Sequence, residues 1–157
     1  MSMDSRMESF RALLLGSPCV LSALANGAAW LYGTLDRVNW AGFYLMRDGA
    51  LVLGPFRGKP ACDRIPQGKG VCGTAAAEDR VIRVEDVNAF AGHIACDPAS
   101  RSEIVVPVHD ADGRVWGVLD VDSDLQARFG PEEEAFFRAA ALAVEDALRS
   151  LPRSFTL

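Results

Sequence analysis

The sequence has no long uninterrupted apolar run and no excess of basic residues. Lys and Arg number 16 against 21 Asp and Glu, which gives a net charge of −5. No basic stripe interleaved with aromatic side chains is present, so neither nucleic acid nor an anionic membrane surface is expected as a partner. Internal repeats and low-complexity tracts are also absent. The 157 residues, 50% of them hydrophobic, predict a single soluble domain over 1–157 with its core at about 18–150.

The N-terminal region lacks the features of an export signal. Its apolar run at residues 12–15 ends at Gly16, and acidic Asp4 stands where a signal peptide carries positive charge. Ser17 is instead predicted to cap a helix whose first turn contains Pro18. We therefore expect no export signal, no membrane span and a cytoplasmic location.

The four cysteines form no CxxC pair and the two histidines form no HxxxH pair, so the usual metal-binding spacings are missing. In a reducing cytosol, cysteines are more often catalytic, redox-active or metal-binding than structural disulfides. Cys96 lies in a loop between His93 and Asp97, where ionisable neighbours can hold a thiol as the reactive thiolate. Cys62 and Cys72 lie upstream, also in glycine-rich segments. Two alternatives stay open: a small buried cysteine in a tight turn, and a metal site built from Cys62, Cys72, Cys96 and His93.

Hydrophobic periodicity predicts an α+β domain. Apolar residues recur at helical spacing near both ends of the chain and alternate at strand spacing between them. The expected helices cover about 4–15, 18–35, 71–78 and 131–151, and the expected strands cover 40–46, 51–53, 81–84, 104–108 and 115–122. Gly54-Pro55 is expected to end the second strand. Because hairpins join the strands and no βαβ unit repeats, we expect a central, mainly antiparallel sheet with the N- and C-terminal helices on one face and active-site loops on the other.

The last predicted hairpin brings three carboxylates together. Asp120 and Asp122 are two residues apart on a strand and therefore point to the same side. A four-residue turn would place Glu103 opposite Asp120, and a two-residue turn would place it opposite Asp122. Either register puts Glu103 on the carboxylate face, which Trp116 and Val118 are expected to share.

Like charges opposite one another destabilise a sheet, so this face is predicted to be either a solvated surface or a functional site. A partly enclosed acidic patch attracts an ammonium group, and mutual repulsion raises the pKa of at least one carboxyl, which keeps a proton available for acid catalysis. Calcium or magnesium is the alternative occupant. On an earlier strand, Trp40 and Tyr44 alternate onto one face, which suits a ligand pocket or a second packed layer.

Six segments between about Val38 and Asp124 match the pattern of a known family. They are Asn39–Tyr44, Leu53–Phe56, Gly70–Ala75, Gly92–Asp97, Ser102–Val105 and Gly117–Ser123. In these segments the chain resembles the free methionine-(R)-sulfoxide reductase family, a catalytic branch of the GAF domain fold. The resemblance covers most of the chain. GAF domains in general are sensors without these cysteines, whereas this three-cysteine pattern is specific.

The resemblance implies an oxidoreductase that converts free L-methionine (R)-sulfoxide to L-methionine. By similarity, Cys96 would attack the sulfoxide sulfur, Cys62 would be the leading candidate for the resolving thiol, and Cys72 would be a second resolving or relay thiol. Thioredoxin or another external dithiol would reduce the resulting disulfide, with no bound cofactor and no metal. The sequence leaves open whether the chain forms a homodimer.

The resemblance also assigns the substrate pocket. Glu103, Asp120 and Asp122 would hold the ammonium group of the substrate and polarise the sulfoxide oxygen, while Trp40 and Tyr44 would wall the pocket. Such a site would select the free amino acid, because a peptide-linked residue lacks the ammonium charge. The alternative is a non-catalytic GAF-type module that senses a small molecule or redox state.

Overall fold

The structure is a computed structural model that describes residues 2–94 and 97–153. Six strands form one sheet in the order β3-β2-β1-β6-β5-β4, and every neighbouring pair is antiparallel. The strands are β1 (Val38–Arg47), β2 (Ala50–Gly58), β3 (Arg64–Pro66), β4 (Ile82–Val84), β5 (Ser102–His109) and β6 (Val115–Ser123). The helices are α1 (Met3–Leu15), α2 (Val20–Thr34), α3 (Gly70–Glu78), α4 (Pro131–Ser150) and the short 3-10 helix η1 (Val87–Ala89). The predicted α+β class and antiparallel sheet are confirmed.

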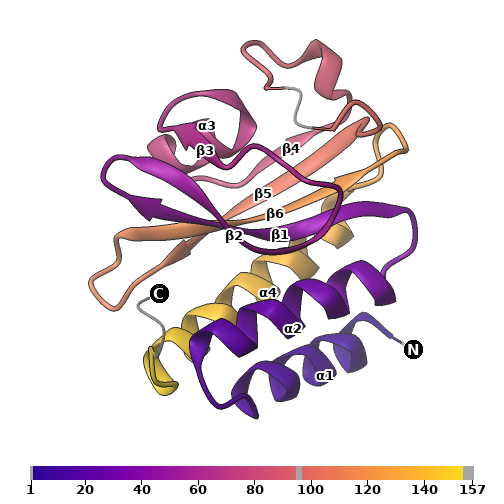
Figure 1. Ribbon diagram of the computed structural model, residues 1–157. Helices are drawn as coiled ribbons and strands as arrows, with labels where there is room; N and C mark the ends of the chain where they lie inside the picture. Colours follow the sequence, from indigo (N-terminus) through magenta and orange to yellow (C-terminus); the bar gives the residue numbers. More distant parts are fainter. Residues whose placement is uncertain (1, 95–96, 154–157) are drawn as a thin grey trace.

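Helices α2 and α4 cover one face of the sheet and α1 packs against their outer side, so the predicted position of the terminal helices is also confirmed (Figure 1). Ala41, Phe43 and Leu45 alternate along β1 into this layer, where they join Phe10 and Leu14 of α1 in one apolar cluster. Both α1 residues are fully buried. Helix α4 begins as predicted, with Pro131 in its first turn and three acidic residues after it.

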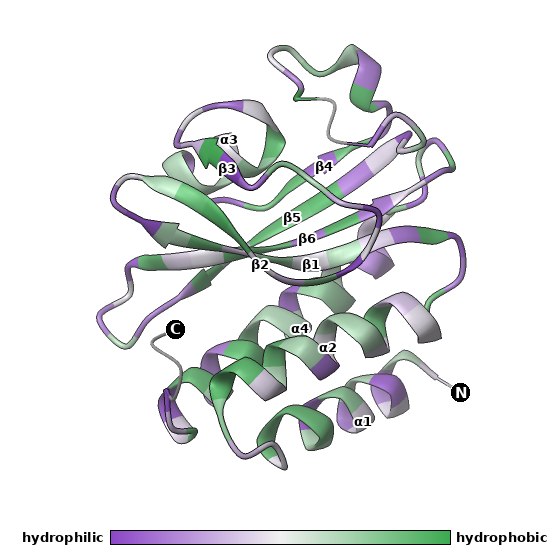
Figure 2. Ribbon diagram, viewed as in Figure 1, coloured by the Kyte–Doolittle hydropathy of each residue, from purple (hydrophilic) through white to green (hydrophobic). Residues whose placement is uncertain are grey.

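The opposite face of the sheet carries α3 and the segment that follows β4 (Figure 1). A second apolar cluster lies on this side and includes Trp40 and Tyr44 from β1, Val105 from β5 and Val118 from β6. Both faces of the sheet therefore carry an apolar cluster, and the strands contain long green stretches in Figure 2. Within the two described stretches, no helix is both long enough and apolar enough to cross a membrane.

Strand β2 is longer than predicted, because Gly54-Pro55 does not end it. The pairing with β1 shifts between Gly42 and Tyr44, so β2 contains a bulge at this point. Strand β3 pairs only with Ala50–Val52, and the proline therefore lies in an unpaired edge segment where its missing N–H costs no ladder hydrogen bond. The extension carries Phe56 onto Trp40, with the ring centroids 5.2 Å apart.

The start of α2 also differs from the prediction. The helix begins at Val20 with Cys19 at the N-cap, and no side chain there caps the helix. The Ser17 hydroxyl instead donates a hydrogen bond to the Leu13 carbonyl at 3.0 Å, which closes the end of α1. The serine thus ends one helix and does not begin the next, a pattern that the Ser-Pro dipeptide does not distinguish by itself.

The β5–β6 hairpin has neither of the predicted turns. The Asp110 N–H donates to the Arg114 carbonyl at 2.9 Å and closes a loop of residues 111–113. That loop alone would pair Glu103 with Val121 and turn it to the helix side of the sheet.

A bulge in β6 returns Glu103 to the predicted face of the sheet. Val108 pairs with Gly117 but His109 pairs with Val115, so Trp116 has no partner on β5 and the register shifts by one residue. Glu103 therefore lies opposite Asp122. The prediction that Trp116 shares the carboxylate face is wrong because of the same bulge. Trp116 points into the helix-side cluster, while Val118 stays on the carboxylate side.

His109 links α3, β5 and α4 at the end of the hairpin. Its Nε2 lies 2.7 Å from Asp79 at the C-cap of α3, and its Nδ1 lies 2.8 Å from Glu145 of α4. Burial lowers the pKa of His109, but the hydrogen bonds and charges of the two carboxylates outweigh it, so that the pKa is raised above 6.5.

We expect His109→Ala to lower the free energy of unfolding by about 1 kcal/mol at pH 6, allowing for solvent screening of a partly exposed site. A raised folded-state pKa contributes stability that is complete below pH 6.5 and is lost as the pH rises through the folded-state pKa. Urea unfolding of both proteins between pH 5.5 and 9 should show the difference shrinking with pH. A loss that stays constant over this range would show that His109 acts through packing alone.

Candidate active site

Three acidic side chains project from the centre of the sheet into one pocket. Asp120 and Asp122 come from β6, with Glu103 of β5 opposite Asp122 and Trp40 of β1 paired with Asp122 on the other side. Glu103 is 7% exposed and Asp120 is 5% exposed. Asp122 is half-buried beside them, so the three acids form a largely buried carboxylate cluster and not the solvated outer face that remained open from the sequence.

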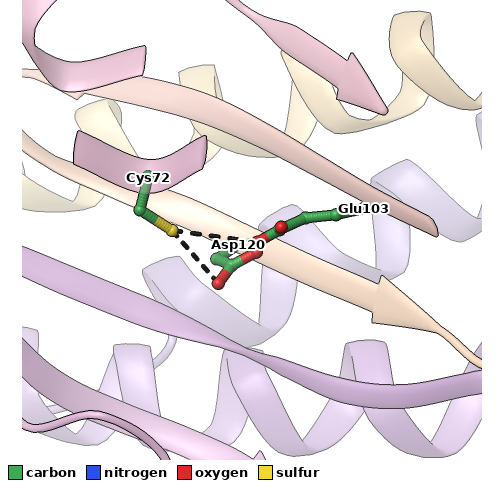
Figure 3. Close-up of side chains that lie close together, drawn as sticks. All are labelled: Cys72, Glu103 and Asp120. Atoms are coloured by element: carbon green, nitrogen blue, oxygen red, sulfur yellow. Dashed lines mark hydrogen bonds between the residues drawn. The ribbon is translucent and has the colours of Figure 1, made fainter. Parts of the chain in front are cut away.

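Cys72 faces this cluster from α3, which packs across β5 and β6. Its thiol lies 3.2 Å from Asp120 Oδ2 and 3.9 Å from Glu103 Oε2, and it is directed at both carboxyls (Figure 3). Helix α3 can approach this closely because Gly70 takes a positive φ of 63° at its start. Gly73 contacts the Pro66 carbonyl so tightly that a Cβ would lie 2.6 Å from the oxygen.

The cluster strongly favours uptake of positive charge. Burial raises the pKa of Glu103 and of Asp122 well above the ordinary range, and neighbouring carboxyls raise both further. Burial and then the charge of Asp122 raise the pKa of Asp120 to about 8. Across the described stretches, none of the ion pairs includes any of these three acids. A proton or a bound cation must therefore balance their charge.

Trp40 and Tyr44 form one wall of the pocket, and their polar atoms hold the loop after β2. Their rings stack with centroids 5.9 Å apart. Trp40 Nε1 donates to the Lys59 carbonyl at 3.2 Å, and the Tyr44 hydroxyl donates to the Cys62 carbonyl at 2.8 Å. The aromatic wall thus holds the backbone of the loop that contains Cys62.

The segment around position 96 lines the other side of the pocket. His93, Ile94 and Asp97 all contribute to the lining, although Cys96 itself lies outside the described residues. Burial lowers the pKa of His93. Asn39 ties Asp97 to β1 through a hydrogen bond from its Nδ2 at 3.2 Å.

Two residues in or beside the pocket had no predicted role. Asn39 also donates to the Ser100 hydroxyl at 3.1 Å, so it holds both ends of the turn after Cys96. Lys69 lines the pocket at the N-cap of α3 and brings a positive charge close to the acidic cluster. Asn39 directly precedes a predicted strand and begins one of the family motifs, but neither signal gave it a role, and Lys69 lies in a glycine-rich loop.

The cysteines differ in their environment. Cys62 is disulfide-bonded and half-buried, whereas Cys19 and Cys72 are free and buried. Cys19 lies at the N-cap of α2, with its Sγ 3.4 Å from the Ser22 hydroxyl, on the helix side of the sheet. The pocket therefore brings together Trp40, Tyr44, Cys72, Glu103, Asp120 and Asp122 as predicted. Their chemical roles stay predictions.

The chain matches the GAF domain family model over residues 7–148. It is 52% identical to the free methionine-R-sulfoxide reductase of Escherichia coli (strain K12) over 141 residues, which cover 90% of this chain and 85% of that protein. It is 57% identical to Protein YtsP of Bacillus subtilis (strain 168) over 126 residues, which cover 79% of this chain and 77% of that protein.

Solved structures give the same picture. The free methionine-R-sulfoxide reductase of Neisseria meningitidis, solved in complex with its substrate, superposes with a TM-score of 0.90 at 39% identity, covering 94% of this chain and 89% of that one. The reduced form of the Staphylococcus aureus fRMsr superposes with a TM-score of 0.89 at 42% identity, covering 94% and 95% of the two chains. The chain therefore belongs to the GAF domain family, in the branch that contains the free methionine-R-sulfoxide reductases.

Proposed function

We propose that this protein is an oxidoreductase that reduces free L-methionine (R)-sulfoxide to L-methionine. The observation that carries the proposal is the buried carboxylate cluster beside a free thiol, Cys72, in a pocket that both flanks of Cys96 also line. The names of the E. coli relative and of the N. meningitidis complex support the same substrate.

The proposed reaction is a two-thiol reduction. The Cys96 thiolate attacks the sulfoxide sulfur, the sulfoxide oxygen takes up a proton, and methionine leaves as Cys96 becomes a sulfenic acid. The Cys62 thiol then condenses with the sulfenic acid, which forms a disulfide and releases water. Thioredoxin or a similar dithiol reduces the disulfide by thiol exchange and returns both thiols. No bound cofactor takes part.

Asp120 is the best-suited acid for the protonation step. Its pKa of about 8 keeps it largely protonated near neutral pH, and it lies in the centre of the cluster. Asp122 and Glu103 would then hold the ammonium group, and Trp40 and Tyr44 would enclose the methyl-sulfinyl end. In this division of work a proton neutralises Asp120, and the ammonium group offsets part of the charge of the other two acids.

The environment of Cys72 supports a secondary role for this thiol. Burial, followed by the charge of Asp120 and Glu103, raises its pKa well above 9.0, which disfavours the thiolate that would attack. Cys62 lies on the loop held by Tyr44 and is disulfide-bonded. We therefore place the first resolving step on Cys62 and give Cys72 a later relay step.

Turnover with three substrates tests the proposal. With a thioredoxin system, we expect rapid reduction of free L-methionine (R)-sulfoxide. The S epimer and N-acetyl-L-methionine (R)-sulfoxide should react at least about 30-fold more slowly in kcat/KM, because the acetylated substrate leaves a buried carboxylate without its charged partner. Methionine release is measured by chromatography.

A chelator is present in all assays so that trace metal does not affect the comparison. Equal rates on the free and acetylated substrates would contradict the ammonium site. Tight binding of the free substrate with no methionine formed would contradict an enzyme and favour a sensor module.

A further inference from the structure

The thiol and two of the acids in the pocket have the composition of a metal site. Cys72 Sγ and one carboxylate oxygen each from Glu103 and Asp120 all lie within 4.8 Å of one another (Figure 3). All three side chains are more than nine-tenths buried. Each comes from a different element, α3, β5 or β6, so the fold and not a local sequence motif assembles the group.

The spacing fits a small tetrahedral ion. A zinc ion bound at about 2.3 Å to sulfur and about 2.0–2.2 Å to oxygen places these two ligand atoms about 3.5 Å apart. The distances from Cys72 Sγ to Asp120 Oδ2 and to Glu103 Oε2 are 3.2 and 3.9 Å, on either side of that value. Little side-chain movement is required for three-point binding.

A separate observation points to an unfilled ligand position. Asp120 Oδ1 is buried and has no hydrogen-bond partner, and the same is true of Asp122 Oδ1. A buried carboxylate oxygen without a partner is costly, and a bound cation removes the cost.

We propose that Cys72, Glu103 and Asp120 form a binding site for Zn²⁺ or a similar thiophilic divalent ion. The sulfur ligand disfavours Ca²⁺ and Mg²⁺, which prefer oxygen. Binding displaces protons from the thiol and carboxyls, so it strengthens as the pH rises. The site does not require Cys62, since Cys72 is free while Cys62 is disulfide-bonded.

The test uses a Cys62→Ser/Cys96→Ser double variant, in which Cys19 and Cys72 are the remaining thiols. Titration with zinc sulfate against a chromogenic chelator should give one ion per chain, with a thiolate-to-metal charge-transfer band when Co²⁺ replaces Zn²⁺. Adding Cys72→Ser should lower the zinc affinity by on the order of 100-fold or more and remove the band. Adding Cys19→Ser instead is the matched control and should change neither.

A second variant guards against misfolding of the Cys72 protein. Asp120→Asn keeps the shape of the side chain and is expected to weaken zinc binding while the far-UV circular dichroism stays unchanged. Zinc binding that survives both Cys72→Ser and Asp120→Asn overturns the proposal. Binding that is present in the native protein but absent from the Cys62→Ser/Cys96→Ser variant also overturns it, in favour of a site built from those thiols.

Discussion

Replacement of Cys96 by serine is expected to abolish methionine formation in a single turnover without added reductant. A serine hydroxyl is a far weaker nucleophile at neutral pH and cannot form the sulfenic acid, so the rate should fall by at least about a thousand-fold. The assay mixes reduced protein with an excess of free L-methionine (R)-sulfoxide, without added reductant, and quantifies methionine per chain.

Two matched variants make this result specific. Cys19→Ser removes a buried free thiol on the helix side of the sheet and should leave the single turnover unchanged. Cys62→Ser should still release one methionine per chain but should stop multiple turnovers with thioredoxin, because the sulfenic acid lacks its first resolving thiol. A Cys96→Ser protein that still releases one methionine per chain would assign the attack to another cysteine.

The carboxylate cluster was predictable from the sequence because side-chain alternation along a strand is strict. Asp120 and Asp122 must share a face because they are two residues apart on a strand. A two-residue or a four-residue turn would each place Glu103 on that same face. The actual hairpin has the odd loop 111–113, and the bulge at Trp116 restores the face. The prediction for Glu103 was therefore correct, but the assumed turn was not.

The two β-bulges account for the strand features that the sequence did not predict. Trp116 and Pro55 each lie where a strand takes up an extra residue, and a bulge depends on the pairing strand as much as on its own sequence. The contact of Cys72 with Asp120 depends in addition on how closely α3 approaches the sheet, a tertiary distance that no local pattern encodes. Alternation predicts faces well, whereas contacts between layers require the assembled fold.

The same reasoning applies to Asn39. The side-chain amide of Asn39 donates hydrogen bonds to Asp97 and Ser100, which are far from it in sequence. Nothing in the sequence distinguishes these two partners from other loop residues. The resemblance to the reductase family included Asn39 in a motif but gave it no function. Long-range polar contacts of this kind are the part of the site that sequence reasoning leaves out.

Asp120→Asn is expected to change activity and stability in opposite directions. The amide keeps the size and the hydrogen-bond acceptor that faces Cys72, but it cannot donate the proton proposed for the sulfoxide oxygen. We expect kcat/KM for free L-methionine (R)-sulfoxide to fall by about 100-fold. At the same time, a buried carboxyl that disfavours its charged form is removed from a cluster of like charges, which should stabilise the fold.

The pH dependence gives the sign of the stability effect. The folded-state pKa of Asp120 is about 8 against an ordinary value of 3.8, so its contribution is complete below pH 3.8 and is lost as the pH rises through 8. The native protein should therefore lose stability between pH 5 and 8, and the variant should lose less. The difference in free energy of unfolding between the variant and the native protein should be small near pH 4 and reach on the order of 2 kcal/mol in favour of the variant at pH 8. It stays this small because the three acids share the cost of burying negative charge.

Urea unfolding across this pH range measures the difference, and Asp112→Asn in the exposed β5–β6 turn is the matched control. The control should stay within about 0.5 kcal/mol of the native protein at every pH. If Asp120→Asn is instead less stable at pH 8, the carboxylate must be held by a partner that offsets its burial. If its kcat/KM is unchanged, another group supplies the proton, and Glu103 becomes the next acid to test because its pKa is raised by the same burial.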